Sequence, residues 1–540
     1  MAERFGENIA PTAAIKAILQ SYPFSIGLLR EILQNSDDAR ATKQVFILDR
    51  RTHGSQSIYH PCLAGSQGAA LLAYNDELIN DDDWRALQNI HRSSKTADTS
   101  KIGKYGIGFR SCYHITDTPH ILSGKYLAIL DPQHEFADYG GVKLKFTDGT
   151  YSHQDQISAF SAFISPYEST RPFNGSIFRL PLRKSQSQIG NTAVSPDEIS
   201  DLLQNFAREE LNVALLFLRN VTSVEIFEIG IDGEKMKIAT ATVKRNPATA
   251  HGDYKIRKVC IHTYLPDSSK EREWRIVHAP FSENEAVEAL AQRLGGNPTA
   301  TLAQHKLMPI VDLAIPLNSP EFTKIGRLFT FLPLPLKTEF PVHVNALFSL
   351  TQSRQNLRNG GEVGIVNHSD DHALIEWNKL LFDTYIPKAW ATLLEVLVRH
   401  DQILNIFSAW PTPQADVQSG DYFYWKDVVL NVTKCAIDLP IWPAFGRNSP
   451  SYDTPEAFLV AETNISDKVL QVLSRTGIEI TQPPQYITRI ITDNFLTRFQ
   501  LLSPQVAHRE LLVCGFTSLF HVVCPHFCLL TERDRWRQEP

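Results

Sequence analysis

The sequence predicts a mixed α/β protein, an α+β sandwich in which helices cover one face of a sheet. Three observations predict this fold class. Short apolar runs typical of buried strands alternate with longer amphipathic segments typical of helices. Hydrophobic residues make up 43% of the 540 residues, which is enough for substantial buried cores. Polar turn residues separate these segments, so each one reads as a distinct element.

The elements of the first region can be placed from these patterns. Amphipathic periodicity predicts helices at residues 11–20, 28–39 and 197–208. Apolar runs bounded by turn residues predict strands at residues 44–48, 71–74, 126–130 and 176–182. A polar run at residues 183–195 is expected to be a loop.

The length suggests about three or four domains, and the patterns divide the chain into three regions. The first, residues 1–230, is the α/β sandwich described above. In residues 231–400, strand-like runs alternate with helical segments at 283–294 and 373–398, which predicts an α/β middle domain. Residues 401–540 contain helical and turn signals without a recognisable motif, so a mostly helical region of uncertain fold is expected.

One predicted helix has an acid and amide face. In the run LLREILQNSDDA, Glu31, Asn35 and Asp38 lie at i, i+4 and i+7, while the apolar residues occupy much of the remaining arc. A solvated surface is the ordinary reading of such a face. Asn is unfavourable inside a helix, however, so its presence at position 35 indicates that the Asn35 side chain has a specific role there. Its amide oxygen suits Mg²⁺, and Glu31 could act as a base.

A glycine cluster about seventy residues later has the composition of a phosphate-binding loop. In KIGKYGIGF, Gly103, Gly106 and Gly108 allow the backbone to approach a ligand closely. The following residues, 109–115, are predicted to be helical and to direct a positive helix end toward phosphates. The spacing matches neither the dinucleotide fingerprint nor the P-loop. An ordinary turn is the alternative interpretation.

These two segments resemble the N-box helix and the glycine lid of the GHKL ATPases, the superfamily of gyrase, histidine kinases, MutL and the heat-shock chaperone ATPases. The resemblance to sacsin and the related Nov-domain proteins is closer. It rests on four segments that follow in order between about residues 24 and 390: LLREILQNSDDARATKQVFILD, LLAYNDELINDDDWRALQNI, GKYGIGFRSCYHITDTPHILSG and FLPLPLKTEFPVHVNALFSL.

The resemblance implies a Bergerat-type ATP-binding domain followed by a transducer-like middle domain. It makes Glu31 the residue that activates the attacking water and Asn35 the Mg²⁺ ligand, with Asp38 on the same helix face. Asp76 falls at the adenine position, and Ser176 resembles the hydroxyl residue that completes adenine recognition. The lid that closes over the phosphates would consist of Gly103, Lys104, Tyr105, Gly106, Ile107, Gly108 and Phe109.

The chain departs from the superfamily pattern at one place. Residues 76–80 read DELIN where the superfamily usually has DxGxG, and both glycines are missing. Sacsin-like proteins share this departure. Asp76 still supplies the acceptor for adenine, but the loss of backbone freedom beside the base disfavours fast turnover. Binding of ATP without hydrolysis is therefore a second interpretation.

A basic residue of the second domain commonly reaches the γ-phosphate in such ATPases, where positive charge stabilises the transition state. We expect Arg354 to have this role because it follows the segment that resembles sacsin. Lys337 and Arg358 are alternative candidates for this role. The interpretation without a functional role is that Arg354 is a solvated surface arginine.

Two functions follow from these expectations: an ATP-hydrolysing conformational switch of chaperone type that acts on client or partner proteins, or a nucleotide-binding module that has lost turnover. A histidine kinase would need a phosphoacceptor histidine on a dimerisation helix, and a topoisomerase would need a nucleophilic tyrosine domain and a basic DNA track. Neither pattern is recognisable here.

Composition sets the remaining expectations. The net charge of −6 predicts no nucleic-acid partner, although a local basic patch at residues 354–358 is left open. Seven scattered cysteines and an N-terminus unlike a secretory signal favour an intracellular protein, cytoplasmic or nuclear.

Residues 511–530 are the one candidate membrane span, but they contain a proline and two histidines, so no membrane partner is expected. Cysteines and histidines also cluster there, without paired metal half-sites.

Overall fold

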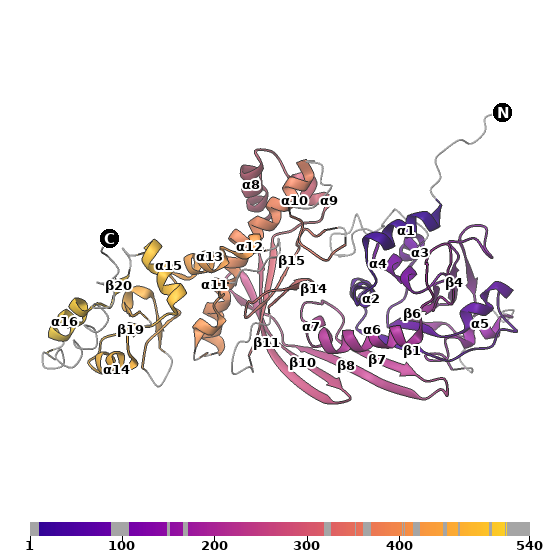
Figure 1. Ribbon diagram of the computed structural model, residues 1–540, viewed down its shortest axis with the longest axis horizontal. Coiled ribbons are helices and arrows are strands. Elements are labelled where there is room, and N and C mark those ends of the chain that lie inside the picture. The colour runs from indigo at the N-terminus through magenta and orange to yellow at the C-terminus, as the bar shows by residue number, and fades with distance from the viewer. Residues whose placement is uncertain are drawn as a thin grey trace, which may run out of the picture.

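The computed structural model describes residues 10–87, 107–147, 152–165, 171–317, 326–351, 353–359, 369–401, 403, 405–413, 422–446, 451–462, 465–495, 499–513 and 515. Within these ranges the chain is a mixed α/β protein built around one large mixed sheet, which confirms the predicted class. The elements of the first region lie at one end of the molecule, the long strands in the middle, and α14 to α16 at the other end (Figure 1).

The sheet has 15 strands and continues through the first two regions. In spatial order its strands are β14 (Leu332–Lys337), β13 (Arg327–Thr330), β15 (His343–Ala346), β12 (Ile310–Pro316), β11 (Ser268–Pro280), β10 (Tyr254–Leu265), β8 (Lys235–Arg245), β7 (Ser223–Ile229), β1 (Lys43–Asp49), β2 (Ala70–Asn75), β6 (Phe173–Pro181), β3 (His120–Gly124), β4 (Tyr126–Leu130) and β5 (Gly141–Lys145), with β9 (Thr249–His251) beside β10.

The sheet crosses the boundary that was expected near Gly230. β1 pairs in parallel with β7, with Phe46 opposite Ile226, and β7 turns back at residues 230–234 into antiparallel β8. Gly230 therefore lies in a hairpin turn between neighbouring strands. The hydrogen-bonded ladder makes the two regions mechanically continuous, and the division into domains at this residue stays a prediction.

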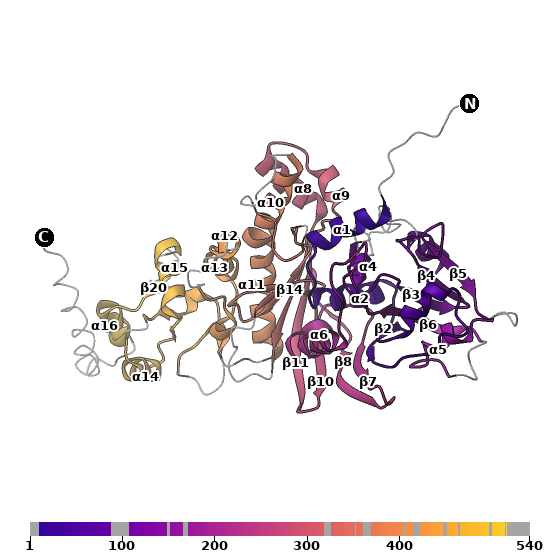
Figure 2. The ribbon, with the colours of Figure 1, turned by 45° about the vertical axis from the view of Figure 1, so that its right-hand side comes forward.

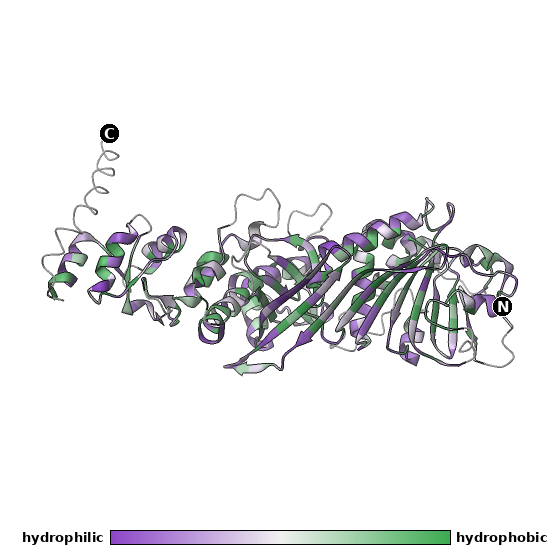
Figure 3. Cartoon of the chain, turned by 90° about the horizontal axis from the view of Figure 1, so that it is seen from below, coloured by the Kyte–Doolittle hydropathy of each residue, from purple (hydrophilic) through white to green (hydrophobic). Residues whose placement is uncertain are grey.

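Strand composition follows position in the sheet. β1 is buried along almost its whole length because it pairs on both sides and is covered on both faces, which explains its continuous apolar run. β8 and β10 alternate between buried and exposed residues, as strands with one solvated face do. Figure 3 shows this as alternating green and purple along the long strands.

Helices cover the sheet in both regions. They are α1 (Pro11–Ser21), α2 (Gly27–Asp38), α3 (Asp81–Leu87), α4 (Ile107–Arg110), α5 (Gln154–Ser158), α6 (Pro196–Glu209), α7 (Leu211–Ala214), α8 (Glu283–Leu294), α9 (Thr299–Gln304), α10 (Ser369–Leu380) and α11 (Ile386–Val396). The expected helix at 197–208 is α6, which begins with a capping box between Ser195 and Glu198.

Two helix predictions need correction. The expected helix at 109–115 is a four-residue helix, α4, followed by a 3₁₀ turn at Ser111–His114, so it is too short to present a strong helix end. The expected helix at 373–398 is interrupted by a π turn at Leu381–Tyr385 and ends in another at Leu397–Asp401. Pro387 lies two residues after the end of the first π turn, and its missing N–H prevents a regular helical bond to that turn.

The last region mixes helices with two small sheets. Its helices are α12 (Tyr422–Trp425), α13 (Val428–Ala436), α14 (Asp467–Arg475), α15 (Gln485–Phe495) and α16 (Pro504–Val513). Its strands are β16 (Trp442–Pro443) with β17 (Tyr452–Asp453), and β18 (Leu459–Val460) with β19 (Ile480–Thr481) and β20 (Gln500–Leu501). No helix in the described ranges is long and apolar enough to cross a membrane. Most of the candidate span at 511–530 lies outside these ranges.

Candidate functional site

The helix α2 is fixed to the sheet by its buried polar residues. The Ser36 hydroxyl donates to Gln44 Oε1 at 2.6 Å and accepts from Asn75 Nδ2 at 3.1 Å, which ties the helix to β1 and β2. The Asp37 carboxylate accepts hydrogen bonds from the backbone N–H groups of residues 219, 220 and 221. These bonds set the rotation of α2, and therefore the directions of the neighbouring side chains.

The Asn35 side chain is suited to hold a cation. Asn35 is half-buried on α2, and its side-chain amide makes no hydrogen bond to any residue in the described ranges. A single amide oxygen with phosphate oxygens and waters is a normal donor set for Mg²⁺. Asp38, also half-buried, lies one turn further along the same helix face. The described residues contain no cluster of three histidine, cysteine or acidic side chains that could hold a metal by itself.

The structure brings Glu31 and Arg354 into direct contact. Arg354 Nη1 donates to Glu31 Oε1 across 323 residues of sequence, so a residue that follows β15 reaches α2. Glu31 is only 7% exposed. Arg354 has a φ of 55°, an uncommon value for a residue other than glycine, in a turn where its N–H donates to the Thr351 carbonyl. The turn directs the guanidinium toward α2.

Tyr22 completes the surroundings of Glu31. Its hydroxyl lies 3.5 Å from Glu31 Oε1, at the limit of a hydrogen bond. Burial, together with the Glu31 carboxylate, raises the pKa of Tyr22, so the phenol keeps its proton and acts as a donor. Gly27 allows this packing, because a Cβ there would lie 2.7 Å from the Tyr22 hydroxyl.

A second ionic bridge joins the same two regions. Glu210 is fully buried and accepts from Arg30 Nε at 2.7 Å and Nη2 at 2.6 Å. It also accepts from Arg327 Nη2 at 2.6 Å, and Arg327 Nε donates to the Leu334 carbonyl at 2.5 Å. Burial lowers the pKa of Arg327, but an arginine stays protonated at neutral pH. One carboxylate therefore holds α2 and β13 together.

The adenine candidates lie together at the end of β2. Asn75, the residue before Asp76, pairs with Ser176 across β2 and β6. The Ser176 hydroxyl donates to the Glu77 carbonyl at 2.6 Å and lies 2.9 Å from Ser123 Oγ. Ser176 is thus buried and engaged within the protein.

The Asp76 carboxylate is also engaged locally. It accepts from Thr42 N at 2.8 Å, Thr42 Oγ1 at 2.5 Å and Lys43 N at 2.9 Å. Burial alone would raise the pKa of Asp76, but these hydrogen bonds outweigh burial and lower it. A carboxylate has about four lone-pair sites, so room remains for one more donor.

The glycine lid lies only partly within the described ranges. Gly103, Lys104, Tyr105 and Gly106 lie outside them, and Ile107 and Gly108 are described by their backbone, as the start of α4. Phe109 is a packing residue whose ring centroid lies 5.8 Å from that of Phe178. Its expected part in a lid is thus limited to anchoring the segment that follows.

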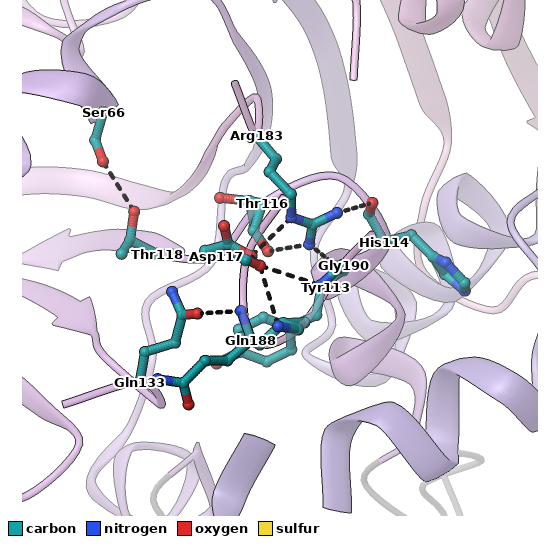
Figure 4. A network of polar contacts seen from close by, with 12 residues as sticks. Ser66, Tyr113, His114, Thr116, Asp117, Thr118, Gln133, Arg183, Gln188 and Gly190 are labelled. Carbon is teal, nitrogen blue, oxygen red and sulfur yellow. Dashed lines mark hydrogen bonds and ion pairs between the residues drawn. The ribbon is translucent and has the colours of Figure 1, made fainter. Parts of the chain in front are cut away.

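Arg183 anchors this segment. Its Nη1 donates to the carbonyl of His114 at 3.0 Å, its Nη2 to that of Tyr113 at 2.5 Å, and its Nε to Asp117 Oδ1 at 2.8 Å (Figure 4). A Cβ at Gly190 would lie 2.0 Å from Arg183 Nη1, so a larger residue there would have to displace the guanidinium. The arginine satisfies the carbonyls at the end of the 3₁₀ turn and fixes the exit from the glycine-rich segment.

Sequence reasoning missed the anchoring residues Arg30, Asp37, Arg183, Glu210 and Arg327. An acidic residue directly before an apolar run, such as Glu210 in REELNVALL, is a weak signal of a buried pair, but it names no partner.

Comparisons with known proteins agree with the resemblance. Residues 9–241 match the family model described as the sacsin domain. Human (Homo sapiens) sacsin is 30% identical over 434 residues, which cover 72% of this chain and 9% of sacsin. A solved structure titled "Crystal Structure of N terminal domain of a DNA repair protein" covers 46% of this chain and 72% of its own, at 13% identity and a TM-score of 0.25. A score this low does not establish a shared fold. The family match and the identity to sacsin show that the chain contains a sacsin domain at residues 9–241.

Proposed function

We propose that the chain binds MgATP in a Bergerat-type site of the GHKL kind and hydrolyses it slowly, as a chaperone-type conformational switch that acts on protein clients or partners. The observation that supports this most directly is the contact between Glu31 and Arg354. These two residues were expected to act on the same phosphate from different regions, and they are neighbours in space.

Each residue has a separate task in this proposal. Asn35 holds Mg²⁺, which when bound neutralises phosphate charge and orients the phosphates. Glu31 orients the attacking water and accepts its proton. Arg354 stabilises the negative charge that develops on the γ-phosphate. Because Arg354 is bonded to Glu31, it has to exchange that carboxylate for the phosphate before the base can act.

This exchange would couple chemistry to movement. Arg354 belongs to the segment after β15, so its transfer from Glu31 to a phosphate changes the contact between that segment and α2. The Arg30–Glu210–Arg327 bridge stays intact and acts as the pivot. A ligand that makes contacts in only one arrangement shifts the population toward it.

A pseudo-ATPase is the second candidate. The missing glycines at residues 76–80 and the engagement of Asp76 by Thr42 and Lys43 favour binding with little or no turnover. Both candidates share the nucleotide site, and they differ only in whether Glu31 is used as a base.

Calorimetry with MgATP tests the proposed site. Asn35→Ala is expected to weaken MgATP binding about tenfold or more, because the amide oxygen completes the Mg²⁺ coordination. Gln20→Ala, on the exposed surface of α1, is the matched control and should bind as the wild type does. An unchanged MgATP affinity in Asn35→Ala would remove Asn35 from the site, and no binding by the wild type would refute the proposal.

A further inference from the structure

A cavity of about 700 Å³ lies on the side of α2 that faces the middle region. Its walls come largely from α1, from α2, from β14, from residues 347–351 and from Arg354. Figure 2 shows α1 beside α2, with β14 next to them. The volume falls in the range of about 300–1,000 Å³ that is typical of small-molecule sites. Asn35, Asp76 and Ser176 do not line it, so it is separate from the proposed adenine and Mg²⁺ positions.

Most of the cavity wall is apolar. Leu332, Leu347 and Phe348 form part of the middle-region side, and Ala14 and Ala17 contribute small side chains from α1. Small residues on one side and large apolar residues on the other leave space for a compact hydrocarbon body. Burying such a body removes apolar surface from water and is favourable.

Gln34 places an amide in this wall. The side chain is 7% exposed and lines the cavity, and no hydrogen bond joins its amide to another residue in the described ranges. The amide is therefore open to the cavity, where water or a polar group of a ligand can take up its hydrogen bonds. Gln34 can donate such a bond to an acidic group that enters the cavity.

The charges beside Gln34 favour an acidic group. The lining residues include three arginines, Arg30, Arg354 and Arg358, but only one carboxylate, Glu31. Glu210 and Asp371 bond to Arg30 and Arg358, whereas Arg354 bonds to Glu31 inside the cavity wall. An acid that enters near Gln34 can receive hydrogen bonds from this amide and compete with Glu31 for Arg354.

We propose that this cavity binds a small amphipathic acid, with its hydrocarbon body against the apolar wall and its acidic head at Gln34 and Arg354. Binding of the acid needs no nucleotide, but the site shares Glu31 and Arg354 with the proposed MgATP site. It uses the face of α2 that carries Arg30 and Gln34, whereas the proposed MgATP site uses the face of Asn35 and Asp38, and Glu31 borders both.

The test uses the full chain without nucleotide and the fluorescent probe 8-anilinonaphthalene-1-sulfonate, displaced by decanoate or by 1-decanol. Decanoate should displace the probe about tenfold better than decanol, since a charged hydrogen bond favours the acid by roughly this factor. Equal displacement by the two compounds would overturn the assignment of an acidic head.

Variants locate the site. Ala17→Trp fills the cavity and should weaken decanoate at least about tenfold, whereas Lys16→Trp, the exposed neighbour outside the lining, should bind as the wild type does. Gln34→Leu keeps the volume, removes the amide and should lose most of the preference for decanoate without a lower melting temperature. Equal decanoate affinity in the two tryptophan variants would overturn the proposal. Because no nucleotide is present, that result would leave the proposed MgATP site untouched.

Discussion

Two ionic bridges join the α2 helix to the middle region, and they differ in burial and in multiplicity. Glu210 has no exposed surface and receives three hydrogen bonds from Arg30 and Arg327. Glu31 receives one bond from Arg354 and a long one of 3.5 Å from Tyr22. The Arg354 side chain is 24% exposed, and it comes from a turn with an uncommon backbone angle. A dry carboxylate with three hydrogen bonds from two arginines resists rearrangement, whereas an ion pair beside a cavity can exchange partners. The first bridge is a fixed joint, and the second is an exchangeable contact.

The largest expected effect comes from breaking the fixed joint. Glu210→Ala leaves two buried guanidinium groups without their carboxylate and should lower the free energy of unfolding by about 3–5 kcal/mol. Asp267→Ala, which breaks the exposed pair with Arg208, is the matched control and should cost at most about 1 kcal/mol. Urea denaturation measures both. Similar costs for the two variants would remove the distinction between joint and surface pair.

Breaking the exchangeable contact should affect chemistry more than stability. Arg354→Ala is expected to reduce ATP turnover about 10²-fold, because a positive charge is lost where negative charge develops. Its unfolding free energy should fall by only about 1 kcal/mol, since Glu31 borders a cavity that water can enter. The control Arg208→Ala should keep full turnover. A large loss of stability with unchanged turnover would make Arg354 a second structural joint.

The adenine end of the proposed site should show a smaller effect. Asp76→Asn replaces a carboxylate acceptor by an amide whose orientation is ambiguous, so the preference for ATP over GTP should fall by about tenfold. Competition binding with the two nucleotides measures this preference. If the wild type already binds ATP and GTP equally, Asp76 does not read the base.

The smallest expected effect is on folding stability at acidic pH, and it comes from Asp49 in β1. Burial would raise the pKa of Asp49, but hydrogen bonds from Arg51 and His53 outweigh it and lower that pKa. A lowered folded pKa gives stability that is present above the unfolded value of about 3.9 and is lost as the pH falls below it. Asp49→Asn should therefore flatten the loss of stability between about pH 4 and pH 2. If urea denaturation shows that Asp49→Asn and the wild type lose the same unfolding free energy as the pH falls over this range, the prediction is contradicted.

Local patterns predicted these helices and strands well, because the periodicity of a helix or a strand can be recognised within a short segment of sequence. β1, β2, β4, β6, α6 and α8 begin and end within a few residues of the expected bounds. The segment expected to be helical at 109–115 is helical as far as His114, but it tightens into a 3₁₀ turn where Arg183 binds the carbonyls of Tyr113 and His114. That arginine is about 70 residues away in sequence, so no local pattern could reveal it.

The residues of the candidate site were predictable where a short segment of sequence identifies them, but not where they meet only in the folded chain. Glu31 and Arg354 were each chosen by their family position, and the structure places them in contact. The partners of Glu210 lie 180 and 117 residues away, and they meet only because the sheet runs through both regions. Gln34 gave no signal either, since a glutamine on a helix is ordinary until its burial is known.

The most direct test of the central claim is turnover of MgATP by the wild type, Glu31→Ala, Arg354→Ala and the double variant, with affinity measured in parallel. If Glu31 is the base and Arg354 serves the same step, Glu31→Ala should bind MgATP almost normally and lose about 10²-fold or more in kcat. The double variant should then be little worse than Glu31→Ala alone, because the two residues act as a unit. A wild-type rate no higher than that of Glu31→Ala would contradict the claim and leave a nucleotide-binding module without hydrolysis.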